Sequence, residues 1–415
     1  MLSRRVFLKN GSLALVTLGF APSFLARTAA AETAGRSKKL IAIFQRGALD
    51  GLNMVVPFGE PAYYQARPSI AIPQPGRGQA NAAIDLDGFF GLHPRMAPLQ
   101  RLWDARQLAI VHACGSPDAT RSHFDAQDYM ESGTPGVKST QDGWLNRYLK
   151  AKAEEHETPF RAVALAAQMP RALQGPAPAI AMTQIQQFGL RGGGAMPTSF
   201  ESQYAAAADA VLKKTGREAF DAMRMLQTNN PQSYQPENGA IYPRSGYGDA
   251  LRQIAQLIKA DVGLEVGFTE ITGWDHHVNE GSVTGQIANR LDDFAQGLAA
   301  LALDLGDRFE DTIIVSMSEF GRAVAENGNR GTDHGHGNAM LILSGSETLR
   351  GRKVYGKWPG LRPEQRYEGR DLAITTDFRD VFGEIVTRHL GVRNPSTIFP
   401  GYEITPAKFP GFLAA

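Results

Sequence analysis

Short apolar runs that alternate with helical patterns are the feature that most constrains how this chain of 415 residues can fold. The clearest run, Thr312–Met317, is rich in β-branched residues and has the length of a buried strand. Strands that alternate with helices predict an α/β fold with a mostly parallel sheet, in which ligands bind at the carboxyl ends of the strands. The other expected strands are Lys39–Phe44, Leu108–His112, Arg161–Ala167, Ala177–Met182, Val266–Ile271 and Ala339–Leu343.

Helical patterns lie between these runs, and three of them belong to a segment of different composition. Residues 183–262 contain a glycine run at 192–194 and a stretch rich in Asn, Gln and Pro at 227–244, which is typical of a long surface loop. We therefore expect one core domain over residues 32–415, with a helical insertion or cap at 183–262. The expected helices are Met96–Trp103, Ser202–Leu212, Arg217–Leu226, Tyr247–Ala260, Gly285–Leu305 and Asp377–Leu390.

The first 31 residues have the composition of a targeting signal. Ser3–Lys9 (SRRVFLK) matches the twin-arginine export pattern, Leu13–Leu25 is a modest apolar run, and Ala29–Ala31 is a small-residue cleavage site. The apolar run is too short to span a membrane, and the alternative is an anchor that stays uncleaved. We predict a signal peptide at 1–31 that the twin-arginine export machinery recognises, and a mature protein that reaches the periplasm or the exterior already folded.

Composition and charge exclude several classes of protein. The chain is 43% hydrophobic and carries 43 basic against 42 acidic side chains, which excludes a disordered protein and a nucleic-acid binder. The single cysteine, Cys114, excludes a disulfide framework and a paired-cysteine zinc site, and it suits an oxidising destination. No second long apolar segment follows the signal, so we expect no transmembrane segment in the mature chain.

Two motifs rich in histidine and aspartate are the main functional signal. Thr272–His277 (TGWDHH) follows an expected strand, and Thr332–Gly337 (TDHGHG) repeats its composition with glycines that let the backbone approach a ligand closely. Imidazole and carboxylate groups suit Zn, Mn or Fe. Each motif alone could be a turn with polar caps, but a shared metal explains both. The candidate metal ligands here are Asp275, His276, His277, Asp333, His334 and His336.

Two further carboxylates are expected at the same edge of the sheet. Glu319 follows the strand at Thr312–Met317, and Asp50 follows the first strand. We treat both as candidate metal ligands. The alternative for Glu319 is a helix cap or an ion pair with Arg322, and the alternative for Asp50 is a plain Asp-Gly turn.

A segment beyond the second expected strand offers a nucleophile. Asp118–Phe124 (DATRSHF) places hydroxyl groups at an expected helix start, where the helix dipole and a nearby metal lower the cost of forming an alkoxide. The alternative is simple capping of the helix by one of the hydroxyls. The candidate catalytic residues are Ser122, Thr120, Arg121 and His123.

On these motifs the chain resembles the exported proteins grouped as domain of unknown function 1501. That family is distantly similar to the alkaline phosphatase and sulfatase superfamily. The resemblance implies a three-layer α/β/α sandwich with an alkaline-phosphatase-like core, metal ligands at the carboxyl edge of the sheet, and hydrolysis of phosphate or sulfate esters. The stretches that carry it span residues 44–345 and are FQRGALDGLNMVVP, GLHPRMAPLQRLW, LAIVHACGSPDATRSHFDAQDYMESG, GWDHHVNEG, IIVSMSEFGR and TDHGHGNAMLILSG.

The superfamily pattern fits this sequence only in part. Where the superfamily has Asp-His after the late central strand, this chain has Glu319-Phe320, so one imidazole is missing. The resemblance implies one metal site with Asp275, His276 or His277, and either His334 or His336. It implies a second site with Asp50, Glu319 and the nucleophile Ser122, or Thr120 in its place. That second site is completed by Asp333 or is absent.

These residues favour an exported hydrolase of phosphate or sulfate esters, with a small-molecule or glycan ester as substrate. Its cofactor would be one or two divalent metal ions, Zn or Mn, and its nucleophile a hydroxyl at a helix start. The departure at Phe320 favours the alternative of a non-catalytic exported protein that binds a metal or a partner. A third hypothesis is redox chemistry at a mononuclear iron or copper site.

Overall fold

The chain divides into two units, Met1–Lys38 and Lys39–Ala415, and the second carries the fold. In the first unit, β1 (Phe7–Lys9) pairs antiparallel with β2 (Ser12–Ala14). The rest of the predicted signal peptide lies outside the described residues, so the signal stays a prediction. The computed structural model describes residues 37–76, 81–152, 158, 160–185 and 234–414, and the backbone of 7–9 and 12–14.

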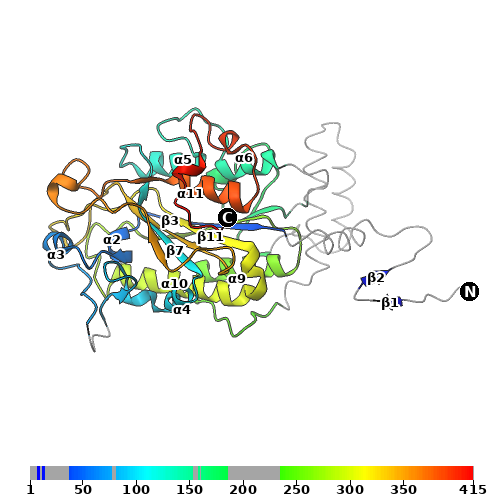
Figure 1. The fold of residues 1–415 in the computed structure, drawn as a ribbon, viewed down its shortest axis with the longest axis horizontal. Coiled ribbons are helices and arrows are strands. Elements are labelled where there is room, and N and C mark those ends of the chain that lie inside the picture. Colours follow the sequence, from blue (N-terminus) through cyan, green and yellow to red (C-terminus); the bar gives the residue numbers. More distant parts are fainter. Residues whose placement is uncertain are drawn as a thin grey trace, which may run out of the picture. The chain divides into compact units, whose positions relative to one another are not determined.

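A mixed but mostly parallel sheet crosses the second unit (Figure 1). One strand, β12 (Asn338–Leu343), is antiparallel to its neighbours β7 (Leu108–Gly115) and β11 (Thr312–Met317). All other neighbours in the sheet are parallel, which confirms the α/β prediction. In order across the sheet the strands are β13 (Lys353–Tyr355), β7, β12, β11, β3 (Lys39–Arg46), β10 (Val266–Thr272), β8 (Ala162–Leu165) and β9 (Ile180–Met182), with β14 (Thr376–Asp377) beside β7.

Helices cover both faces of the sheet and give the expected three layers (Figure 1). Side chains alternate between the faces of a strand, so Ile41 and Ile43 of β3 join one hydrophobic core while Leu40 and Phe44 join the other. Because both faces are covered, the central strands are apolar at nearly every position. One face packs on α4 (Gln100–Asp104), α9 (Gly246–Lys259) and α10 (Gln286–Leu305), and the other on α5 (His123–Ser132), α6 (Trp144–Ala151) and α11 (Phe378–Glu384).

Two of the expected helices differ from the prediction. The helix expected at Met96–Trp103 is a 3₁₀ segment, Pro94–Leu99, followed by α4, because Pro98 cannot donate the hydrogen bond of an α-helix interior. The helix expected at Asp377–Leu390 begins with Asp377 as its cap, as predicted, but α11 passes into a π-helical turn at Ile385–His389. The structure also has short helices and a small sheet before α4: α2 (Gly51–Met54), α3 (Pro61–Ala66), β4 (Val55–Val56), β5 (Ile84–Asp85) and β6 (Gly91–Leu92).

The predicted insertion is described only at its ends. The helices expected at Ser202–Leu212 and Arg217–Leu226 lie outside the described residues, so the insertion stays a prediction. At its C-terminal end, α9 packs on α10 and β10 in the helical layer of the core. The loop before α9 is fastened to the core by the hydroxyls of Tyr234 and Tyr242, which donate to the buried carboxylate of Asp304 at 2.6 and 2.8 Å. Within the described part of the chain, no helix has the length and apolarity needed to cross a bilayer.

Candidate metal centre

The candidate site lies where three loops meet at the carboxyl edge of the sheet. β3, β10 and β11 are adjacent and parallel, so the residues that follow each of them emerge at the same edge. The connection from β11 to β12 starts and ends at this edge because β12 is antiparallel. The start of α5 joins them, since α5 follows β7. The fold therefore gathers loops that are distant in sequence.

Four side chains from these loops point their ligand atoms at one another. The Nε2 atom of His334 lies 2.9 Å from Nε2 of His123 and 2.9 Å from Nε2 of His277. An Asp275 carboxylate oxygen lies 3.0 Å from Nε2 of His277 and 3.2 Å from Nε2 of His334. The ligand atoms of His123, Asp275 and His334 all lie within 4.8 Å of one another. We call His123, Asp275, His277 and His334 the four-residue cluster.

The second nitrogen of each imidazole in the cluster faces a hydrogen-bond acceptor. Nδ1 of His334 lies 2.8 Å from the carbonyl oxygen of Arg121, which can only accept, so this nitrogen carries a proton. Nδ1 of His123 donates to the Glu319 carboxylate at 2.8 Å, and Nδ1 of His277 faces Asp333 at 3.4 Å. In the neutral tautomers the three Nε2 atoms are therefore unprotonated, and their lone pairs converge with a carboxylate oxygen.

The pKa shifts of the cluster have separate causes. Burial alone raises the pKa of Asp275, but the hydrogen bond and charge of Arg322 outweigh it and lower the pKa to about 2. The hydrogen bond to Glu319 raises the pKa of His123. Burial lowers the pKa of His334. The cluster therefore holds a carboxylate that stays ionised over most of the pH range.

Glu319 lies behind the cluster and orients His123. It is fully buried and accepts hydrogen bonds from His123, from Gln127 Nε2 at 2.8 Å, from the Gly47 backbone at 2.9 Å and from the Ser318 hydroxyl at 2.9 Å. Burial raises its pKa, but these donors outweigh burial and leave the pKa below its ordinary value. Glu319 therefore contacts a histidine of the cluster and is not itself part of it.

Arg322 holds the loops of the site together. It is almost fully buried and donates to Asp275 at 2.6 Å and to the carbonyls of Gly47, Ala48 and Thr332 at 2.6, 2.6 and 3.0 Å. The sequence alternative of an ion pair with Glu319 does not describe its contacts, because its carboxylate partner is Asp275. One guanidinium thus fixes the loops after β3 and β10 and the loop before β12.

Glycines allow the ligand loops to approach each other. A Cβ atom on Gly331 would lie 2.4 Å from the carbonyl oxygen of His277, and a Cβ on Gly335 would lie 2.4 Å from the carbonyl oxygen of Arg322. Backbone hydrogen bonds join the same segments, from Thr332 N to His276 O at 3.0 Å and from Gly335 N to Gly321 O at 2.8 Å. Gly335 of the predicted motif and Gly331 just before it thus allow close contact between loops, while the expected close approach of this backbone to a ligand stays a prediction.

Asp50 lies outside the cluster. Its buried carboxylate accepts two hydrogen bonds from the buried guanidinium of Arg67, one of them at 3.0 Å, and its own side chain also caps α2 at Leu52. Burial raises the pKa of Asp50, but Arg67 outweighs it and lowers the pKa. The neighbouring Glu280 is fully buried, and burial raises its pKa well above the ordinary value. An arginine and an acid thus occupy the space around Asp50.

Three other predicted ligands are also apart from the ligand atoms of the cluster. His276 is buried, and burial lowers its pKa to about 4. The ring of His336 stacks on Tyr367 with centroids 4.2 Å apart. Asp333 is exposed and lies behind His277, where it also accepts a hydrogen bond from Asn327 at 3.1 Å.

The predicted catalytic segment is divided in its roles. His123 is a member of the cluster. Ser122 is exposed at the N-cap of α5 and makes no capping hydrogen bond, whereas the Thr120 hydroxyl accepts from the Ser122 backbone at 3.2 Å. The guanidinium of Arg121 is bound to two carboxylates, Asp371 at 2.6 Å and Glu368 at 2.7 Å. The structure therefore brings His123 to the ligand atoms, while Ser122 is the exposed residue that precedes it at the N-cap of α5.

Sequence reasoning missed several residues around the site. Arg67 and Asp371 stand in segments without any motif, and no sequence signal distinguishes them. Gln127 lies one helical turn after His123, at the spacing that places two side chains on one face of a helix, so that signal was available.

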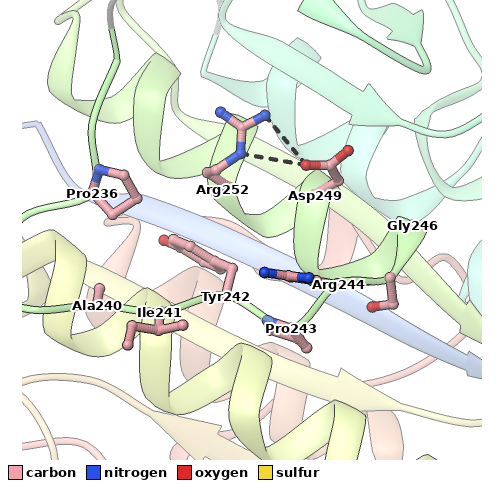
Figure 2. A pocket seen from close by; sticks show the side chains of 10 residues that line it. Pro236, Ala240, Ile241, Tyr242, Pro243, Arg244, Gly246, Asp249 and Arg252 are labelled. Atoms are coloured by element: carbon pink, nitrogen blue, oxygen red, sulfur yellow. Dashed lines mark hydrogen bonds and ion pairs between the residues drawn. The ribbon is translucent and has the colours of Figure 1, made fainter.

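A surface depression at the start of α9 shares no residue with the cluster (Figure 2). Tyr242, Arg244 and Ile241 are among the residues that line it. Its Arg252 is paired with Asp249 at 3.2 Å. The four-residue cluster therefore lies at the carboxyl edge of the sheet and not in this depression.

The chain matches one protein-family model over most of its length. Residues 37–379 match the model of the family described as "Protein of unknown function (DUF1501)". No curated protein matches the chain.

Among solved structures, the chain is similar to members of the alkaline phosphatase and sulfatase superfamily. The PsFucS1 sulfatase from Pseudoalteromonas sp. is 13% identical, with 91% of this chain and 72% of that chain covered and a TM-score of 0.40. The C-terminal periplasmic domain of EcEptC from Escherichia coli, in complex with Zn, is 9% identical, with coverage of 75% and 74% and a TM-score of 0.36. A protein in the alkaline phosphatase superfamily from Vibrio parahaemolyticus is 11% identical, with coverage of 75% and 60% and a TM-score of 0.30. Likenesses this distant say nothing about the chemistry of the site.

Proposed function

The chain belongs to the DUF1501 family, whose function is unknown, and we propose that this member binds one divalent metal ion at the four-residue cluster and hydrolyses phosphate or sulfate esters there. The observation that carries the proposal is the convergence of three imidazole nitrogens and one carboxylate oxygen, described above. Three lone pairs in contact repel one another unless a cation or a proton lies between them. Neutral imidazoles and a carboxylate are the ligands that Zn and Mn accept, so the donor set fits the ion.

The contacts around the cluster favour one ion over two. A second site would need Asp50 and Glu319 as ligands. However, Arg67 forms an ion pair with Asp50, and the Glu319 carboxylate accepts hydrogen bonds from His123 and its other donors. Arg322 supplies a further positive charge beside Asp275. Of the two carboxylates expected at a second site, Asp50 is therefore neutralised by a guanidinium, and the hydrogen-bond acceptors of Glu319 are occupied by His123 and its other donors.

The cluster is open to solvent on one side. The side chains of Asp275 and His277 are 46% and 41% exposed, so a substrate oxygen can reach the ligand atoms there. A divalent ion held here would supply Lewis-acid catalysis by polarising the ester and activating a nucleophile. Asp275 and the three imidazoles would hold the ion, and the exposed hydroxyl of Ser122, next to His123 in the chain, is the protein nucleophile closest in sequence to the ligands.

The experiment has a binding arm and a catalytic arm. Elemental analysis of the purified protein is expected to give about one equivalent of Zn or Mn, and a His277→Ala/His334→Ala variant is expected to lose it. Aryl phosphate and aryl sulfate esters then test hydrolysis, with Ser122→Ala beside the wild type. Folded protein that binds no added Zn or Mn rejects the metal site. Metal-loaded protein inactive on both esters rejects the hydrolase.

Two exposed apolar side chains that adjoin cluster residues in the chain favour a second candidate, in which the metal-bound site takes a protein partner without catalysis. Among the described residues, Phe124 is 88% exposed and Val278 is 51% exposed, and each directly follows a histidine of the cluster. Exposed apolar side chains beside a site are typical of binding surfaces. The test applies to metal-loaded protein that hydrolyses neither ester. If Phe124→Ser lowers retention of this protein by its native cell envelope, the result supports the candidate. Unchanged retention contradicts it.

A further inference from the structure

His334 is the central residue of the four-residue cluster. Its Nε2 atom is the only ligand atom within 3.2 Å of those of His123, His277 and Asp275 among the described contacts. A small rotation of this ring would therefore disturb the contacts of His334 with all three other members of the cluster. The groups that fix the ring decide whether the ligand atoms converge.

Two arginines fix His334 from opposite ends. The carbonyl oxygen of Arg121 accepts the Nδ1 proton of the His334 ring at 2.8 Å. The guanidinium of Arg370 donates to the backbone carbonyl of His334 at 2.8 Å. One contact sets the orientation and tautomer of the ring, and the other sets the backbone that carries it.

One buried carboxylate, that of Asp371, binds Arg121 by two hydrogen bonds and lies near Arg370. Oδ2 of Asp371 accepts from Nε and Nη2 of Arg121 at 3.1 and 2.6 Å, and Oδ1 lies 3.7 Å from Nε of Arg370. The Asp371 side chain is fully buried. Its backbone is fixed as well, since it exchanges two hydrogen bonds with Tyr367 and forms a bridge with Ala323.

The geometry points to Asp371 as a positioning residue for His334. Through its hydrogen bonds to Arg121 it fixes the carbonyl that orients the His334 ring and sets the Nδ1–H tautomer, with Arg370 as a weaker electrostatic neighbour, and so it sets the metal affinity of the cluster. The inference rests on the proposed metal site. It also accounts for Arg121, whose guanidinium is directed at Asp371 and Glu368 and whose carbonyl is directed at the site.

The test compares two carboxylates that bind the same guanidinium. Asp371→Asn removes the buried charge, and we expect the affinity for Zn to fall about 10- to 100-fold, as is typical when a group that supports a metal ligand is lost. Glu368→Gln removes the exposed partner of Arg121 and should change the affinity by less than about fivefold, because exposed ion pairs are weak. Affinity is measured by competition with a chromogenic chelator.

A spectroscopic readout separates positioning from general destabilisation. In metal-free protein with ¹⁵N-labelled histidine, the Nδ1–H resonance of His334 should shift or broaden in Asp371→Asn and stay unchanged in Glu368→Gln. If Asp371→Asn does not fold, Arg121→Ala should move the same resonance and Arg121→Lys should restore it in part. Equal Zn affinity and an unmoved resonance in these variants overturn the inference. Wild-type protein that binds no Zn rejects the proposed function, while the resonance still tests the positioning.

Discussion

At the scale of single residues, the orientation of the His123 imidazole depends on the Glu319 carboxylate that accepts its Nδ1 proton. Glu319 is buried, ionised and surrounded by donors, so it keeps the His123 ring in one tautomer with Nε2 free. The sequence predicted Glu319 as a direct ligand. The structure gives it this supporting contact, and the proposed roles of both residues await measurement.

We expect Glu319→Gln to lower the Zn affinity about 10- to 100-fold, because an amide oxygen is a weaker acceptor for the His123 Nδ1 proton than a carboxylate. Titration against a chelator measures the change. The matched control is Glu131→Gln, a buried carboxylate that contacts Arg46 and the Ala172 backbone. Equal loss of Zn affinity in both variants would show that the effect comes from general loosening of the fold.

For Asp50, another ligand predicted from sequence, we expect substitution to leave metal binding unchanged. Asp50→Asn should leave the metal content at about one equivalent, because the Asp50 carboxylate faces Arg67 and not the cluster. It should lower the free energy of unfolding by about 3 to 5 kcal/mol, since the buried guanidinium loses its partner. Elemental analysis and denaturant titration check the two parts. Loss of metal from a folded variant would return Asp50 to the ligand set.

The sequence predicted which residue types lie at this edge but not where each side chain points. His276 and His277 are neighbours in the chain, yet one is buried and the other faces the cluster, and no periodicity in a loop decides between them. Arg67 could not be predicted at all, because a buried arginine is recognised only from the carboxylate that it meets in space.

At the scale of elements, the loops of the site depend on close backbone contact. The loop at residues 331–337 contacts the loop that carries His277, and at Gly331 there is no room for a Cβ atom between the two backbones. The ligand atoms can converge only if the backbones of the two loops lie close together. The glycine contacts allow that close approach.

We expect Gly331→Ala to lower both the Zn affinity and the thermal stability, because the added Cβ would lie 2.4 Å from the His277 carbonyl and must push the loops apart. Gly328→Ala is the matched control, since a Cβ there meets nothing within 4 Å. Calorimetry and chelator competition measure both effects. The same melting temperature in the two variants would contradict the role given to this contact.

The strands were predicted from sequence more fully than their arrangement. All expected strands exist, since apolar runs of this length are buried on both sheet faces. The antiparallel direction of β12 was not predicted, because strand direction depends on the length of a connection and not on the strand itself. The π-helical turn after α11 has no signal in the helix pattern either.

At the scale of the whole molecule, two core histidines make stability depend on pH. His93 donates to the Ser282 carbonyl at 3.0 Å and accepts from Arg95 N, while His112 donates to the Val55 carbonyl at 3.0 Å and accepts from Ala113 N. Burial lowers the pKa of each to about 4. Both are therefore neutral in the folded protein near neutral pH.

We expect the metal-free protein to lose stability as the pH falls from about 6.5 towards 4. Over this range histidines of the unfolded chain, with a pKa of about 6.5, bind protons that the buried rings do not, so acid favours unfolding. Each ring contributes up to about 1.4 kcal/mol per pH unit, and nothing further above pH 6.5. Denaturant titrations at several pH values test this. His93→Gln/His112→Gln should flatten the profile, and an unchanged slope in that variant would assign the acid sensitivity to other groups.

The antiparallel direction of β12 has a consequence for how this protein can change over evolutionary time. The connection from β11 to β12 leaves the sheet and returns to it at the same edge. It is therefore a single loop, and it carries Glu319, Asp333 and His334. Insertions or deletions between its fixed points leave the strand pairing intact. Lineages can therefore diversify the mouth of the site by altering one loop while they inherit the same hydrophobic interior, and we expect length variation among relatives to concentrate there.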